Sequence, residues 1–87
     1  MYRIEVVIRN ETGLHARPAA YLVKEASRFQ SEIRVGKDGQ SVDAKSIISV
    51  MSLGATKGDV VEIAAEGADA EEAVEALRRL VEAGLGE

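Results

Sequence analysis

A histidine at the predicted start of a helix is the residue of this chain best suited to reactive chemistry. His15 is the only histidine, and it lies in the segment Gly13-Leu14-His15-Ala16-Arg17-Pro18-Ala19-Ala20. A helix N-terminus carries unpaired backbone N–H groups and a partial positive charge, so it favours a neutral imidazole and accommodates an anion. Arg17 adds a planar cation that can hold a phosphate group. The segment therefore combines a nucleophile with donors for an anion built on it.

Less specific interpretations of His15 stay open on these residues alone. A single histidine near a helix start is more often a plain surface or capping residue. A small hydrolase using His15 as a general base would need an orienting carboxylate, and the sequence places none beside it. A small-ligand-binding domain would need an apolar pocket that a shallow sheet of this size rarely offers. A nucleophile without a base partner is better suited to receiving and donating a group.

A second candidate site begins at Ser46. The segment from Ser46 to Leu53 predicts a short helix with Ser46 at its N-cap. Ser46 is thus either a simple cap or a phosphorylation site, because a phosphate at a helix start is tolerated by the dipole and adds strong negative charge. The apolar side chains that follow it either enter the core or form an exposed patch for a partner; they are Ile47, Ile48 and Met51.

Length and composition limit the function classes. The 87 residues predict one domain, 1–87, with one core. The absence of cysteine excludes disulfides and thiolate metal sites, and one histidine makes a metal site improbable, so no cofactor is expected. Eleven basic against fifteen acidic residues, with few aromatics, argue against direct nucleic-acid binding. No signal peptide or membrane-spanning run is visible, which predicts a cytoplasmic protein without membrane insertion.

The elements around His15 follow from periodicity. Tyr2, Ile4, Val6 and Ile8 alternate with mostly polar residues and predict a strand with one buried face. The stretch from Ala16 to about Phe29 has apolar residues at helical spacing. Because Pro18 is tolerated only in the first turn of a helix, this helix must begin close to His15.

The second half of the chain predicts a hairpin, two helices and a last strand. Asp38-Gly39 separates the short strand patterns Glu32–Gly36 and Gln40–Asp43, a good hairpin signal. Val60–Glu66 alternates as a strand. The final helix is predicted to start with a capping box of Asp69 and Glu72, to carry a Glu75–Arg79 ion pair, and to stop at Gly84.

The predicted order of elements is β-α-β-β-α-β-α. Four short strands in an antiparallel sheet would have one face covered by three helices and the other open to solvent. The fold class expected is therefore α+β, as an open-faced β-sandwich.

Two segments of the chain together resemble a known family. Gly13-Leu14-His15-Ala16-Arg17-Pro18-Ala19 resembles the active-site segment of HPr, the histidine-containing phosphocarrier of the bacterial phosphoenolpyruvate-dependent sugar phosphotransferase system. Lys45-Ser46-Ile47-Ile48-Ser49-Val50-Met51-Ser52-Leu53-Gly54 resembles the regulatory-serine segment of that family. The two occur in the expected order and separation, and the resemblance covers essentially the whole chain.

The resemblance implies a phosphoryl carrier rather than a free-standing enzyme. His15 would accept a phosphoryl group on Nδ1 (the pros nitrogen) from phosphorylated enzyme I and donate it to sugar-specific enzyme IIA domains. The Arg17 side chain and the backbone of Ala16 and Arg17 would hold the phosphate. An HPr kinase/phosphorylase would phosphorylate Ser46, which would slow phosphorylation of His15 and favour binding to a catabolite-control transcription regulator.

The family's docking patch corresponds here to Ile47, Ile48 and Met51, with Ala20 and Lys24 beside them. Ala20 stands where members often carry threonine, and isoleucines replace the phenylalanine or methionine of relatives, so partner preference can differ. The alternative within the same fold is a chiefly regulatory HPr-like module, for example of a nitrogen-related branch. The retained His15 argues against regulatory paralogues without the histidine. A monomer is expected.

Overall fold

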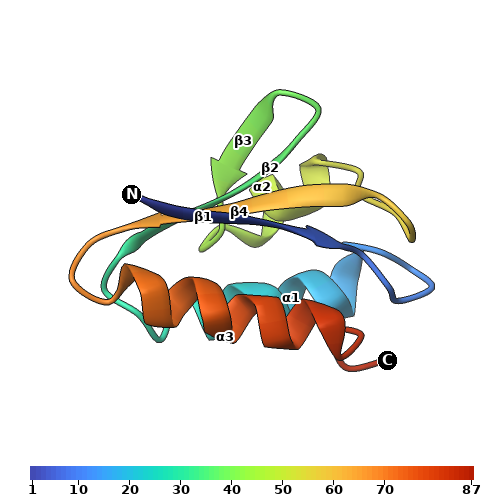
Figure 1. Cartoon of the computed structure of the whole chain (residues 1–87). Coiled ribbons are helices and arrows are strands. Elements are labelled where there is room, and N and C mark those ends of the chain that lie inside the picture. Colours follow the sequence, from blue (N-terminus) through green and yellow to red (C-terminus); the bar gives the residue numbers. More distant parts are fainter.

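A computed structural model describes residues 1–87 as a four-stranded sheet with three helices (Figure 1). The elements are β1 (Tyr2–Val7), α1 (Ala16–Ala26), β2 (Glu32–Lys37), β3 (Gln40–Asp43), α2 (Ile47–Ser52), β4 (Val60–Glu66) and α3 (Ala70–Glu82). All strand pairs are antiparallel, in the order β1-β4-β2-β3. The predicted fold class and element order are confirmed. None of the helices has the length and apolar character needed to cross a membrane.

The core lies between the sheet and the helices. Helices α1 and α3 run side by side beneath the sheet, and α3 packs on β1 and β4 (Figure 1). Val6 of β1 pairs with Val61 of β4, while Val35 of β2 pairs with Ile63 of β4, so the buried sides of three strands face the same way. A cluster of 20 buried apolar residues fills this layer. The alternation read from the strand sequences is thus the alternation between core and solvent.

The β2–β3 hairpin forms at the predicted turn. Asp38 and Gly39 both have positive φ, 52° and 82°. This matches a type I′ turn, whose twist suits a two-residue hairpin. The pairing of Lys37 with Gln40 closes the strands directly around these two residues.

Helix α1 ends three residues before the predicted Phe29. The hydroxyl of Ser27 donates to the carbonyl of Val23 at 2.8 Å, and the Ser27 amide donates to the same carbonyl at 2.9 Å. The next amides, of Arg28 and Phe29, bond three residues back, which tightens the chain into turns before β2. Phe29 still packs against the core, so its apolar spacing was correct although its conformation is not helical.

The predicted capping box at the start of α3 is wrong. Asp69 is the N-cap residue, but its side chain makes no cap bond. Its carboxylate instead accepts from the amides of Gln30 and Ser31, at 3.0 and 2.9 Å, and from the Ser31 hydroxyl. Asp69 therefore ties the connection between α1 and β2 to the start of α3.

Of the two remaining predictions for α3, the ion pair is wrong and the end of the helix is correct. Glu75 pairs with Arg78 at 3.2 Å, so the predicted pairing with Arg79 is wrong. The stop at Gly84 is confirmed. Gly84 has φ 93°, its amide bonds to the carbonyl of Val81, and the Leu85 amide bonds to that of Leu80, the pattern of a Schellman motif.

Asp69 is expected to make stability depend on acid pH. The Ser31 hydroxyl, followed by the Gln30 amide, lowers the pKa of the Asp69 carboxyl in the folded state. A carboxyl with a lowered folded pKa stabilises the fold above its unfolded pKa and loses that contribution as pH falls through the folded value, here below about pH 4. Asp69→Asn should therefore melt lower than the parent at neutral pH and converge with it in acid.

The measurement is the thermal midpoint of both proteins from pH 7 to pH 2. Glu71→Gln is the matched control, because it removes an exposed carboxylate from the first turn of the same helix without breaking a side-chain hydrogen bond. A constant difference between Asp69→Asn and the parent at all pH values would contradict this account.

Candidate functional site

His15 occupies the position predicted for it, at the start of α1. It is the N-cap residue, with extended backbone angles of φ −93° and ψ −167°. Its carbonyl accepts the first helical bond, from the Ala19 amide at 2.7 Å. The residue is exposed, and its imidazole has no hydrogen-bond partner within the protein. The ring is therefore free to meet another molecule.

The loop before His15 is held by close backbone contacts. Gly13 has φ 66°, and a Cβ atom there would lie 2.3 Å from the carbonyl oxygen of Ala55. That carbonyl accepts from the Leu14 amide at 3.0 Å, and the Leu14 side chain is buried. The side chain of Asn10 donates to the Gly13 carbonyl at 2.8 Å. These contacts fix the backbone that enters α1 and therefore fix the position of His15.

Donors for an anion are present in the first turn of α1. The amides of Ala16 and Arg17 bond to no acceptor in the protein, as is usual for the first residues of a helix. Pro18 follows without an N–H, so these two are the free amides of the first turn of α1. The Arg17 side chain is exposed and takes part in none of the ion pairs or side-chain hydrogen bonds of the protein. The three groups provide N–H donors and a positive charge within two residues of His15.

Ser46 caps α2, as predicted. Its Oγ accepts from the Ser49 amide at 3.4 Å, a long hydrogen bond, and the residue is half-buried. Lys45 beside it is less free than a surface lysine, because its ammonium donates to the Phe29 carbonyl at 2.8 Å. The geometry is that of an ordinary cap with a hydroxyl near the surface.

The apolar residues of α2 divide between surface and core. Ile48 is 78% exposed and Ile47 is 39% exposed, so the core interpretation is wrong for both. Met51 is half-buried and packs against the core. Helices α1 and α2 are in contact, and Ala20 and Lys24 of α1 are exposed. We call these five residues the α1–α2 surface.

Tyr21, 43% exposed on α1, is a surface residue that the sequence analysis missed. It lies four residues after Arg17 and three before Lys24, so all three fall on one helical face. That spacing was visible in the sequence. Tyr21 lies outside the apolar stripe of α1, so the stripe by itself does not point to this residue.

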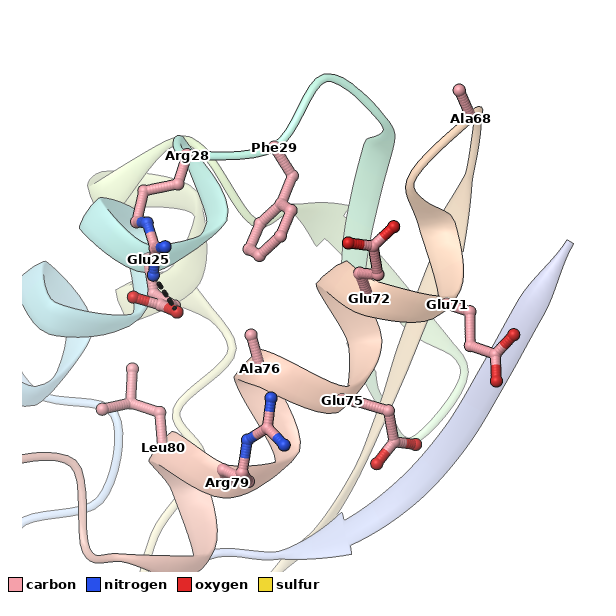
Figure 2. A pocket seen from close by; sticks show the side chains of 10 residues that line it. All are labelled: Glu25, Arg28, Phe29, Ala68, Glu71, Glu72, Glu75, Ala76, Arg79 and Leu80. Atoms are coloured by element: carbon pink, nitrogen blue, oxygen red, sulfur yellow. Dashed lines mark hydrogen bonds and ion pairs between the residues drawn. The ribbon is translucent and has the colours of Figure 1, made fainter.

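The largest groove of the molecule is elsewhere. It has a volume of about 780 Å³ and lies between the C-terminal end of α1 and most of the length of α3 (Figure 2). Phe29, Ala76 and Leu80 line its floor, while Glu71 and Glu75 point outward. Arg28 is paired with Glu25 at 2.8 Å. None of the predicted site residues lines this groove, which is at the opposite end of α1 from His15.

Fold and site together define a small open-faced sandwich that presents one exposed histidine, with free N–H donors, at the start of a helix. The family model described as "PTS HPr component phosphorylation site" matches residues 2–83. The chain belongs to the HPr family, the phosphocarriers of the phosphotransferase system.

Individual relatives agree with this assignment. The phosphocarrier protein HPr of Vibrio cholerae is 50% identical over 82 residues, which cover 94% of this chain and 96% of the relative. The HPr-like protein Crh of Halalkalibacterium halodurans is 48% identical, covering 94% of this chain and 98% of its own length.

Solved structures agree as well. A crystal structure of HPr from Thermoanaerobacter tengcongensis superposes with a TM-score of 0.96 at 53% identity, covering 100% of this chain and 98% of that one. A second structure from the same organism, described as an HPr dimer, gives a TM-score of 0.80 at 53% identity and covers 100% of both chains.

Proposed function

We propose that this protein carries a phosphoryl group on His15, receiving it from phosphorylated enzyme I and donating it to sugar-specific enzyme IIA domains. The observation that carries the proposal is the exposed, unpartnered imidazole at the start of α1, next to the free amides of Ala16 and Arg17. Membership of a phosphocarrier family supports the same role.

The transfer is a substitution at phosphorus. The lone pair of His15 Nδ1 forms the new N–P bond while the bond between phosphorus and the donor atom of enzyme I breaks, and the electron pair of that bond stays with the donor. In the second transfer an acceptor atom of enzyme IIA forms a bond to phosphorus while the N–P bond breaks, and the electron pair of that bond returns to His15 Nδ1. Such transfers depend mainly on in-line positioning and charge stabilisation. The two amides and the Arg17 guanidinium supply the stabilisation, and solvent exposure keeps it moderate, so that the group can leave again.

Docking of the partners is assigned to the α1–α2 surface. Ile47 and Ile48 provide an exposed apolar centre, and Lys24 provides a charged rim. A small patch of this kind favours weak, transient complexes. That suits a carrier that must leave one partner before it meets the next.

The test is a labelling assay with phosphoenolpyruvate and purified enzyme I. We expect one phosphoryl group per chain, on His15, in a bond that is labile in acid and stable in base. Mass spectrometry after digestion at alkaline pH locates the modified residue. Absence of label from the folded protein would contradict the proposed function.

We further propose that Ser46 is a regulatory site for an HPr kinase/phosphorylase and that its phosphorylated form binds a catabolite-control transcription regulator. The support is the placement of the Ser46 hydroxyl at the start of α2, next to Ile47 and Ile48, and the similarity to a Crh protein. A phosphate there would add charge to the surface assigned to enzyme I.

Ser46→Asp is expected to slow phosphorylation of His15 by enzyme I about tenfold, because a new charge at a docking surface chiefly lowers the association rate. The measurement is the initial rate of labelling at several salt concentrations, and salt should reduce the difference. Gln40→Glu is the control, since it adds the same charge on β3, in the hairpin. Equal slowing by both variants would assign the effect to net charge and contradict a role for the Ser46 position.

The chiefly regulatory alternative makes the opposite prediction for His15. A regulatory module would bind its partner without turnover of a phosphohistidine, so rapid passage of the label from His15 to an enzyme IIA domain favours the carrier. We expect the working form to be a monomer, although structures of two relatives, an HPr and a Crh protein, are described as dimers.

A further inference from the structure

The last residues of the chain are fastened to the fold. After the end of α3, the Leu85 side chain is fully buried in the core, and its backbone has the left-handed φ of 52°. The Glu87 amide donates to the Gly84 carbonyl at 3.0 Å. Chain ends are usually mobile unless something holds them. Here the tail turns back toward the start of α1 (Figure 1).

The tail lies against the exposed side of α1. Gly86, with φ 86°, is so close to the Tyr21 ring that a Cβ atom would lie 2.5 Å from the Cε2 atom. Any side chain at this position would collide with the ring. The contact places the following residue, Glu87, beside the loop that precedes α1.

The Glu87 side chain then bonds to Thr12, which is 75 residues away in the sequence. The Thr12 hydroxyl donates to one carboxylate oxygen, and the Thr12 amide donates to the other at 3.5 Å. The Thr12 hydroxyl hydrogen bond, the strongest influence on this carboxyl, lowers the pKa of Glu87, so the group stays charged at neutral pH. Thr12 is three residues before His15.

Thr12 also belongs to the turn of residues 10–13, which leads into α1. The Asn10 side chain donates to the Gly13 carbonyl at 2.8 Å and lies 3.5 Å from Thr12 Oγ1. The Gly13 amide returns a bond to the Asn10 carbonyl at 3.2 Å. Thr12 is therefore inside a closed turn of residues 10–13, and it is the residue of that turn that reaches the C-terminal tail.

We propose that Glu87 is a positioning residue for the His15 site: its carboxylate holds Thr12 and thereby keeps the Asn10–Gly13 turn, and the imidazole three residues beyond Thr12, in the geometry for phosphoryl transfer. The proposal rests on the proposed function of His15. Glu87 acts through the turn and does not itself take part in the chemistry. The buried Leu85 side chain and the close contact of Gly86 with Tyr21 place the Glu87 carboxylate beside Thr12.

The test compares Glu87→Ala with Glu82→Ala in the enzyme I assay. Glu82 is exposed, lies in the last turn of α3 and has no hydrogen-bond partner, so its removal changes the charge equally without touching the loop. For Glu87→Ala we expect kcat to fall about tenfold with KM nearly unchanged, because a small misplacement of a reacting group lowers the rate of the chemical step. Glu82→Ala should behave like the parent protein.

Variants of Thr12 separate positioning from general stability. Thr12→Ser keeps the hydroxyl and should retain the parent rate, while Thr12→Val removes it and should behave like Glu87→Ala. The double variant should be no slower than either single one, because both remove the same contact. Additive losses, or a rise in KM alone, would overturn the proposal.

Amide hydrogen exchange tests the role of Glu87 without a measurement of phosphoryl transfer. In Glu87→Ala the Gly13 and Leu14 amides should exchange faster, and the His15 ring signals should shift, while Glu82→Ala leaves both unchanged. If the parent protein accepted no phosphoryl group, the proposed function would fail, and unchanged exchange and ring signals would separately overturn the role of Glu87. Faster exchange with an unchanged transfer rate would overturn it as well.

Discussion

His15→Ala is expected to accept no phosphoryl group from phosphoenolpyruvate and enzyme I, while it keeps the fold and stability of the parent. The loss should be complete, because the chain has no second histidine to take the N–P bond. Stability should be retained because the imidazole is exposed and makes no capping or other hydrogen bond. Exposed substitutions of this kind usually change the free energy of unfolding by less than about 0.5 kcal/mol.

The measurements are stoichiometric labelling and thermal denaturation of the same preparation. Arg17→Ala is an informative companion, since it removes an exposed side chain without a protein partner and should slow transfer without abolishing it. Label that persisted in folded His15→Ala, with the same acid-labile and base-stable character, would show that the phosphoryl group resides on another residue.

Gly13→Ala is expected to damage both the stability of the protein and the His15 site. A residue with a side chain costs about 1 kcal/mol at φ 66°. The added Cβ would also lie 2.3 Å from the Ala55 carbonyl oxygen, so backbone must move. Overpacking of this type adds about 1–3 kcal/mol, so we expect a total loss of about 2–4 kcal/mol in the free energy of unfolding.

Comparison with Gly54→Ala isolates the steric contribution, because Gly54→Ala carries the backbone cost alone. Gly54 has nearly the same φ, 64°, but a Cβ there would meet nothing within 4 Å. Its expected cost is therefore only the backbone cost of about 1 kcal/mol. Chemical denaturation of both variants measures the difference. Phosphoryl transfer should fall in Gly13→Ala only, because the moving backbone is that of the loop before His15. Equal losses of stability would contradict the close contact with Ala55.

Local sequence patterns predicted the elements and the place of His15 well, because each depended on neighbouring residues. The bounds Val60–Glu66 followed from the apolar residues at every second position, Val61, Ile63 and Ala65, and the hairpin followed from Asp38-Gly39. The start of α1 followed from Pro18, which permits only a narrow range of helix starts.

Two errors are local, the end of α1 and the partner of Glu75, where competing bonds three or four residues apart decide the outcome. The other errors lie where a side chain bonds to a residue far along the sequence. The carboxylate of Asp69 had a local role available as a cap, but the amides of Gln30 and Ser31, which no local pattern places nearby, take it instead. The contact of Glu87 with Thr12 spans 75 residues and was equally invisible. Exposure was also hard to read: Ile48 belongs to an apolar run, yet a helix of six residues can bury only one side.

The bond network of Asp69 has a mechanical consequence for α1. The chain directly after this helix is fastened through Ser31, which is buried and presses on Gly67 so closely that a Cβ atom there would lie 2.6 Å from the Ser31 hydroxyl. The other end carries His15, held by a loop and a surface carboxylate. Helix α1 is therefore fastened at both ends, by the Asp69 hydrogen bonds after its C-terminal end and by the Gly13 and Leu14 contacts at the end that carries His15. The imidazole is thus presented on a rigid support, so that a docking partner meets it in one fixed position.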